Sequence, residues 1–219
     1  MVVAIMLAAA ISGLSSRDST NCRGSHATAE PAAQPIHIVL QVVAAASTPR
    51  ELLNTMIDSA AAIWAAYNVV VSPVLSTAIP ESREGEWITL VFRNEPANRI
   101  DGVARRGDRG LASLTFTGDA PGNVMYVSYE TAASMIQGAG FGKGVMAVEE
   151  RLAAQLLGRA VAHELGHFLL RSRNHARRGL MRSSFNPSDS TPGNPERFRL
   201  LPDQMHVLSL YNPATLQAR

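Results

Sequence analysis

The residues with the clearest chemical potential lie in one short motif, His163-Glu164-Leu165-Gly166-His167. Residues four apart in an α-helix lie on the same face, so His163 and His167 would point in one direction. Two neutral imidazole nitrogens placed in this way can bind one metal ion, and zinc accepts histidine nitrogen readily. Glu164 is offset by one residue, so its carboxylate can reach a zinc-activated water without occupying a ligand position. The motif therefore predicts a hydrolytic zinc centre with one Zn²⁺ per chain.

The same five residues have a simpler explanation, which is a helix that carries polar side chains on its solvent face. The motif falls at the end of the longest apolar helical pattern in the chain, from about Ala147 to Leu170. Polar groups without partners are costly to bury, so a polar face on such a helix needs a reason. This position favours the metal site.

A catalytic zinc ion takes three protein ligands and a water, so the motif needs a third ligand. His175 lies eight residues after His167, in a segment that can turn back under the site once the helix ends near Leu170. Asn174 suits a left-handed turn at this place. The alternative for His175 is a solvated side chain in a basic loop. Other side chains that fit less well are Glu196, His206 on the last predicted helix, Asp189 in a polar loop, and His37 on the first predicted strand.

A second signal follows the candidate third histidine, in Gly179-Leu180-Met181. The glycine permits a turn, and the turn delivers a methionine close to the predicted site. Methionine is a soft, adaptable side chain that can pack beneath a ring of imidazoles. The alternative is an ordinary core methionine, and the two readings differ only in where Met181 packs.

The elements that must position these residues come in the order strand, helix, three or four strands, long helix, loop and helix. This order predicts an α/β domain in which two long helices back a twisted mixed sheet of four to five strands, with a C-terminal helix after them. Thr48 is the expected cap of the first helix, with Pro49 after it. The expected strands and helices cover 36–43, 49–67, 69–75 (broken at Pro73), 87–93, 111–116, 124–128, 147–170 and 201–211.

Composition and charge exclude several classes of protein. Hydrophobic residues make up 46% and charged residues 17% of the 219 residues, which is ordinary for a globular domain. A net charge of +2 gives no electrostatic footprint for nucleic acid, and 5% aromatic residues are too few for a base-stacking surface. The single cysteine excludes a disulfide framework within the chain and a multi-cysteine metal cluster. We expect no nucleic-acid partner and a monomer.

The N-terminal region reads as an export signal. Residues 2–14 form an apolar run of 13 residues, which is shorter than the roughly 20 that span a bilayer but suits a signal-peptide core. A cleavage site, Ala27-Thr28-Ala29, follows, although no Lys or Arg precedes the run. The alternative is a disordered or buried apolar N-terminus. We expect a signal peptide over 1–29, a linker over 30–35, one domain over 36–219 without a membrane span, and a secreted or periplasmic location.

Taken together, the histidine motif, the downstream histidine, the methionine turn at Met181 and the C-terminal helix resemble the metzincin clan of zinc peptidases. The resemblance covers roughly residues 36–211 and is strongest to small exported bacterial members with an extended loop before the third histidine. It implies a zincin-like α+β fold and a peptide or protein substrate. It also implies that zinc is held by His163, His167 and His175, with Glu164 as the general base.

The chain departs from the clan in the segment after His167. The usual pattern has a glycine three residues after the second histidine and the third ligand three residues later, where this chain has Leu170 and Arg173. His175 therefore lies two residues further along than the pattern requires.

The resemblance also implies an antiparallel strand at the edge of the cleft, which binds substrate by pairing with a peptide strand. The candidate strand is 111–116, and the residues expected to contact substrate are Leu111, Ala112, Ser113 and Leu114. Two other functions remain open. One is an inactive zinc-binding module that binds peptide or a cell-surface polymer. The other is a metal-dependent hydrolase of a different substrate such as nucleic acid, against which the near-neutral charge counts.

Overall fold

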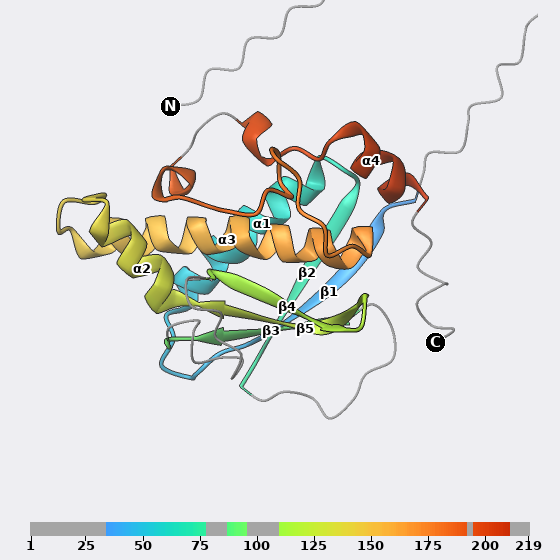
Figure 1. Cartoon of the computed structure of the whole chain (residues 1–219). Coiled ribbons are helices and arrows are strands. Elements are labelled where there is room, and N and C mark those ends of the chain that lie inside the picture. Colours follow the sequence, from blue (N-terminus) through green and yellow to red (C-terminus); the bar gives the residue numbers. More distant parts are fainter. Residues whose placement is uncertain (1–33, 78–86, 96–109, 192–194, 211–219) are drawn as a thin grey trace, which may run out of the picture. The chain divides into compact units, whose positions relative to one another are not determined.

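A computed structural model describes residues 34–77, 87–95, 110–191 and 195–210 (Figure 1). The chain divides into two units, Met1–Ala33 and Gln34–Arg219, and all the structure described below belongs to the second. The expected signal peptide and the first part of the expected linker lie outside the described residues. Among the helices that are described, none combines the length and apolarity needed to cross a membrane.

Five strands form a single mixed sheet. The strands are β1 (Ile36–Val43), β2 (Val69–Ser76), β3 (Trp87–Arg93), β4 (Ala112–Thr117) and β5 (Ala120–Ser128). Their order across the sheet is β2-β1-β3-β5-β4. All neighbouring pairs are parallel except β4 with β5, which is an antiparallel hairpin at one edge. This arrangement confirms the predicted α/β class, including the antiparallel edge strand.

Four α-helices accompany the sheet in the described ranges: α1 (Arg50–Ala65), α2 (Tyr129–Gly138), α3 (Met146–Leu170) and α4 (Pro202–Ser209). The two long helices, α1 and α3, pack against each other, and α3 also contacts β4 and β5 (Figure 1). The segment between α3 and α4 contains two short 3-10 helices, Pro187–Ser190 and Pro195–Phe198. The two predicted long helices and the C-terminal helix are confirmed.

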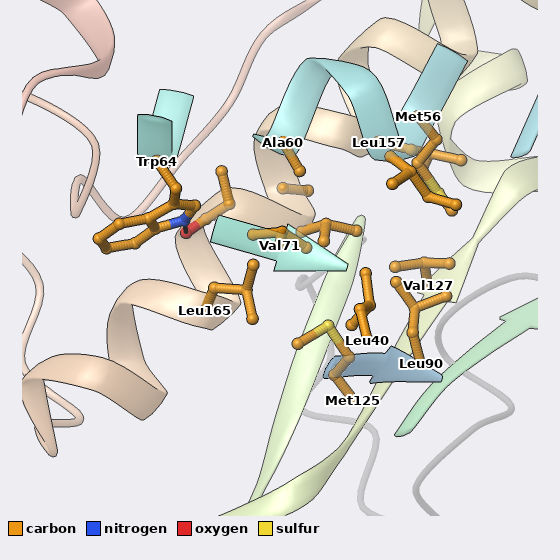
Figure 2. Packing of buried hydrophobic residues seen from close by; sticks show 14 of the residues in the cluster. Leu40, Met56, Ala60, Trp64, Val71, Leu90, Met125, Val127, Leu157 and Leu165 are labelled. Carbon is orange, nitrogen blue, oxygen red and sulfur yellow. Dashed lines mark hydrogen bonds between the residues drawn. The ribbon is translucent and has the colours of Figure 1, made fainter. Parts of the chain in front are cut away.

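The hydrophobic core lies between these two helices and one face of the sheet (Figure 2). Trp64 of α1 is completely buried, and its Nε1 donates a hydrogen bond of 3.0 Å to the carbonyl oxygen of Ala162 in α3. Helix α1 comes equally close at Gly158, where an added Cβ would collide with the carbonyl oxygen of Met56. These contacts fix the turn of α3 that directly precedes the histidine motif.

Several local predictions were wrong. Strand β2 runs through Pro73 without a break, because an edge strand tolerates a residue that lacks an N–H donor. The strand expected over 124–128 begins earlier, because β5 starts at Ala120 after a two-residue turn with Gly118 at a φ of 59°. The cap of α1 is Pro49 rather than Thr48, and no side chain caps it.

Helix α2 was not predicted at all. It begins directly after Ser128, which ends β5 and also caps the helix, because its side chain accepts a hydrogen bond of 3.2 Å from the backbone N–H of Thr131. Because Ser128 ends the strand and also caps the helix, no loop separates the two elements. The sequence therefore contains no run of turn residues that would mark the start of α2.

Candidate functional site

The two histidines of the motif lie side by side on α3 and are both buried, with 5% of His163 and 4% of His167 exposed. Nδ1 of His163 lies 2.9 Å from the carbonyl oxygen of Leu180, and Nδ1 of His167 lies 2.6 Å from that of Ser172. A carbonyl oxygen only accepts, so each Nδ1 carries the ring proton and each Nε2 keeps a lone pair. The two Nε2 atoms are 2.9 Å apart, which places two lone pairs at one point, as a shared metal ion requires.

The structure brings His175 to the same point. The candidate ligand atoms of His163, His167 and His175 all lie within 4.8 Å of one another. The His175 ring centroid is 5.2 Å from that of His163 and 4.9 Å from that of His167, although His175 itself is exposed. These three side chains are a chemically suitable set for zinc, because neutral imidazoles are common zinc ligands.

The longer spacing to His175 has a structural reason. Helix α3 ends at Leu170, and Arg171 adopts the left-handed conformation at a φ of 49°, one residue after the glycine position of the metzincin pattern. The chain then turns so that the carbonyl oxygen of Ser172 meets Nδ1 of His167. After this turn the backbone N–H of Ala176 donates a hydrogen bond of 2.7 Å to the carbonyl oxygen of Met181, which fixes the position of His175.

The other candidate ligands lie elsewhere. Glu196 forms an ion pair of 2.9 Å with Arg199, and Asp189 is buried in ion pairs with arginines. His206 is exposed on α4, and His37 is exposed on β1. Within the described ranges, none of these four joins the group formed by the three histidines.

Burial keeps both histidines of the helix neutral. It lowers the pKa of His163 to about 3, against the opposing effect of the bond to the Leu180 carbonyl. It also lowers the pKa of His167, whose bond to the Ser172 carbonyl again opposes the shift. Histidine must be neutral to bind a metal, so both rings are in the ligand form at neutral pH.

Glu164 lies beside the histidines and is only 8% exposed. Its Oε2 accepts a hydrogen bond of 2.8 Å from the backbone N–H of Leu114, in the edge strand β4. Burial raises the pKa of the Glu164 carboxyl to about 7, while the bond from Leu114 acts in the opposite direction. A carboxyl group with a pKa near 7 can both take up and release a proton under physiological conditions.

The predicted substrate strand thus lies next to the site. Leu111 pairs with the end of β5, because its carbonyl oxygen accepts a hydrogen bond of 3.0 Å from the N–H of Ser128. Ala112 and Ser113 lie opposite residues of β5. Leu114 is hydrogen-bonded to Glu164, and substrate contact by the four residues stays a prediction.

Met181 packs beneath the helix that carries the motif and is 1% exposed. Gly166, between Glu164 and His167, is in direct contact with it, because an added Cβ at Gly166 would collide with the Sδ atom of Met181. The glycine inside the motif therefore makes room for the methionine.

Aromatic side chains flank the histidines on both sides, and no sequence pattern predicts them there. Phe116 of β4 meets His167 edge-on with ring centroids 6.1 Å apart, and Phe185 meets His163 edge-on at 5.5 Å. The guanidinium of Arg173 lies 4.4 Å from the centre of the Phe116 ring. The edge strand and the segment after α3 therefore meet beside His167.

A cluster of ion pairs around the buried Asp189 stabilises the turn that carries Met181. Asp189 lies 2.5 Å from Nη2 of Arg182 and 3.0 Å from Nη2 of Arg197. Arg182 also donates hydrogen bonds to the carbonyl oxygens of Ser184 (2.9 Å) and Arg197 (2.8 Å). In the sequence Asp189 was considered only as a metal ligand, and its contacts show a structural role.

Comparison with known proteins finds matches among solved structures but not among family models or curated proteins. No model of a known protein family matches the chain, and no curated protein matches it. Among solved structures, the chain is similar to the crystal structure of archaemetzincin from Methanopyrus kandleri, with a TM-score of 0.48 and 15% sequence identity. That match covers 82% of this chain and 97% of the other.

Proposed function

We propose that this protein is a zinc-dependent endopeptidase. The observation that carries the proposal is the pair of Nε2 lone pairs 2.9 Å apart on His163 and His167, with His175 close by and Glu164 on the same helix. A bound zinc ion would be held by the three histidines, where it would activate a water for attack and polarise the scissile carbonyl. The chemistry of this donor set fits one zinc ion per chain.

Glu164 is the general base in this proposal. Its Oε2 is held by the N–H of Leu114, so Oε1 is the atom that takes the proton from the attacking water. The carboxyl group then passes this proton to the nitrogen of the leaving amine. Burial raises the pKa of the Glu164 carboxyl, which favours its protonated form between these two transfers.

The edge strand positions the substrate. Among the strands that the structure describes, β4 pairs with β5 alone, which leaves its outer edge for a peptide in extended conformation. Backbone groups of Leu111 to Leu114 that face this outer edge and are not bonded to Glu164 or β5 would pair with the peptide backbone and place the scissile bond beside Glu164. The side chains of the substrate matter less for this pairing, because main-chain groups make the bonds.

One observation favours the second candidate, an inactive zinc-binding module that binds peptide or a cell-surface polymer. His175 is exposed and reaches the site from a segment outside the helix, whereas the other two ligands are buried. If His175 does not bind zinc in solution, the site has two ligands and loses the geometry of a catalytic centre.

A peptide-library cleavage assay tests the proposal. The zinc-loaded protein is incubated with the library beside Glu164→Gln, and new termini are identified by mass spectrometry. We expect cuts by the wild type, loss of these cuts on chelation, their return with zinc, and none from Glu164→Gln. If the variant binds zinc and cuts as fast as the wild type, the role of Glu164 is wrong. A folded, zinc-bound wild type that cuts nothing supports the binding module.

A further inference from the structure

The segment that follows α3 is strongly basic. Residues 171–199 contain seven arginines and only two acidic residues, Asp189 and Glu196. The edge strand across the site, Ala112–Thr117, has no charged residue. The segment after α3 is therefore positively charged, whereas the edge strand on the other side of the histidines is uncharged.

Both acidic residues of this segment are already engaged by arginines. Asp189 is paired with Arg182 and Arg197, and Glu196 is paired with Arg199. Four exposed arginines form no ion pair with any residue that the structure describes: Arg171, Arg173, Arg177 and Arg178. These four flank His175 in the sequence, and Arg177 and Arg178 line one pocket with it, which places positive charge beside the candidate metal ligand.

A pocket opens at the same place. It has a volume of about 620 Å³ and is lined by His175 and Met181, which also belong to the candidate site. Apolar side chains of Leu170 and Leu201 contribute to its walls, and Arg177 and Arg178 contribute two positive charges. Asp203 of α4 is the one acidic residue in the lining, so the basic groups outnumber it.

We propose that this pocket binds an acidic side chain, Glu or Asp, of the peptide substrate, with Arg177 and Arg178 as its partners. The inference rests on the proposed peptidase function. A guanidinium group pairs with a carboxylate through two parallel hydrogen bonds, which lysine cannot make, and the apolar walls accommodate the methylene stem of the side chain. Arg173 adds positive charge at the edge-strand side of the same site.

Binding, measured apart from cleavage, tests this inference. Full-length zinc-loaded Glu164→Gln is titrated with fluorescent peptides of one length that differ only by Glu or Gln at a single position, moved along the peptide. At one position we expect the Glu peptide to bind about fivefold more tightly than its Gln partner. The ratio should fall as salt is added, because exposed charges are screened.

The arginines are tested by the double variant Arg177→Gln/Arg178→Gln, in which the ratio of Glu to Gln binding should fall to about one. Arg151→Gln is the matched control, because Arg151 is an exposed arginine of α3 that lies twelve residues before His163, about 18 Å along the helix. In this control the ratio of Glu-peptide to Gln-peptide binding should equal that of the protein with both arginines intact. If the double variant does not fold, the single variants Arg177→Gln and Arg178→Gln should each lower the ratio.

The inference would be overturned by equal binding of Glu and Gln peptides at every position, by equal loss of the ratio in Arg151→Gln, or by equally tight binding of a DNA oligonucleotide of the same charge. The last would identify a general polyanion surface. Failure of the peptidase proposal looks different, because Glu peptides would still bind selectively while the wild type cuts none of them. Cleavage of Glu and Gln peptides at the same kcat/KM would contradict the pocket inference alone.

Discussion

The backbone N–H of Leu114 donates a hydrogen bond of 2.8 Å to Oε2 of Glu164, across fifty residues of sequence. This N–H is available because β4 is the last of the described strands in the sheet and pairs with β5 on its other side. The strand proposed to bind substrate therefore also orients the proposed general base. A substrate that pairs with β4 would be placed relative to Glu164 by the backbone of the same strand.

Removal of this one donor should raise the pKa of Glu164. An amide-to-ester replacement at Leu114 removes the N–H but keeps the side chain. The bond favours the charged carboxylate, so we expect the pKa of Glu164 in the metal-free protein to rise further above its present value of about 7. Carbon-13 NMR titration of the glutamate carboxyls measures it.

The same replacement at Thr115 is the control, because it removes the neighbouring backbone N–H of β4 and leaves the bond from Leu114 to Glu164 in place. It should lower stability without moving the pKa of Glu164. An unchanged pKa in the Leu114 ester would show that the bond does not form in solution.

Glu164→Gln should stabilise the metal-free protein at high pH. The folded-state pKa of Glu164, about 7, lies above the ordinary glutamate value of 4.5, so the unfolded chain releases the proton first as pH rises. The wild type should lose stability relative to the variant as pH rises from 4.5 through 7, by about 3 kcal/mol in total. The buried histidines contribute equally to both proteins and cancel.

Urea unfolding of both metal-free proteins at pH 4 and pH 8 measures this difference. The free energies of unfolding should be similar at pH 4 and should favour the variant at pH 8. A constant difference between the two proteins at both pH values would mean that Glu164 ionises normally in the folded state.

Gly166→Ala should destabilise the protein through Met181. The added methyl group collides with the Sδ atom of Met181 in a fully packed region, so we expect the free energy of unfolding to fall by about 1–3 kcal/mol. Combination with Met181→Ala should remove the clash and make the two effects less than additive. Gly138→Ala is the control, since nothing lies within 4 Å of its added Cβ. Additive losses in the double variant would show that the two residues are not in contact.

Asp189→Asn should weaken zinc binding without touching a ligand. Asp189 pairs with Arg182, and the neighbouring Met181 holds the Ala176 backbone, next to His175. Loss of the buried charge should lower stability by about 3 kcal/mol. We expect zinc affinity, measured by competition with a chelator, to fall about tenfold.

The same substitution in a His175→Ala protein separates an effect of Asp189 on zinc affinity from general destabilisation. In His175→Ala the third ligand is already absent, so Asp189→Asn should change zinc affinity little. An equal fall in both backgrounds would mean that Asp189 does not act through His175.

The sequence was sufficient for the groups whose spacing is set by one helix. His163, Glu164 and His167 follow from helical periodicity, and His175 follows from the need for a third ligand. Their partners could not be predicted in the same way. Ser172 and Leu180 contribute carbonyl oxygens and Leu114 contributes an N–H, and every residue has such groups. Which of them faces the site depends on packing between distant segments.

The same distinction between local periodicity and long-range packing applies to the fold. The long periodic patterns of α1 and α3 and the β-branched strands were correct because burial determines them. Pro73 was taken as a strand break, since the position of β2 at the edge of the sheet depends on long-range pairing. Asp189 looked like a loop carboxylate, because its pairing with Arg182 and Arg197 exists only after the segment has folded.

The proposed function depends on one zinc ion held by three named histidines. X-ray absorption at the zinc edge, measured on the wild type and on His175→Ala loaded with one zinc each, tests this most directly. We predict three imidazole ligands at about 2.0–2.1 Å in the wild type and two in the variant. The same number of imidazole ligands in both proteins would contradict His175 as the third ligand, and with it the proposed catalytic centre.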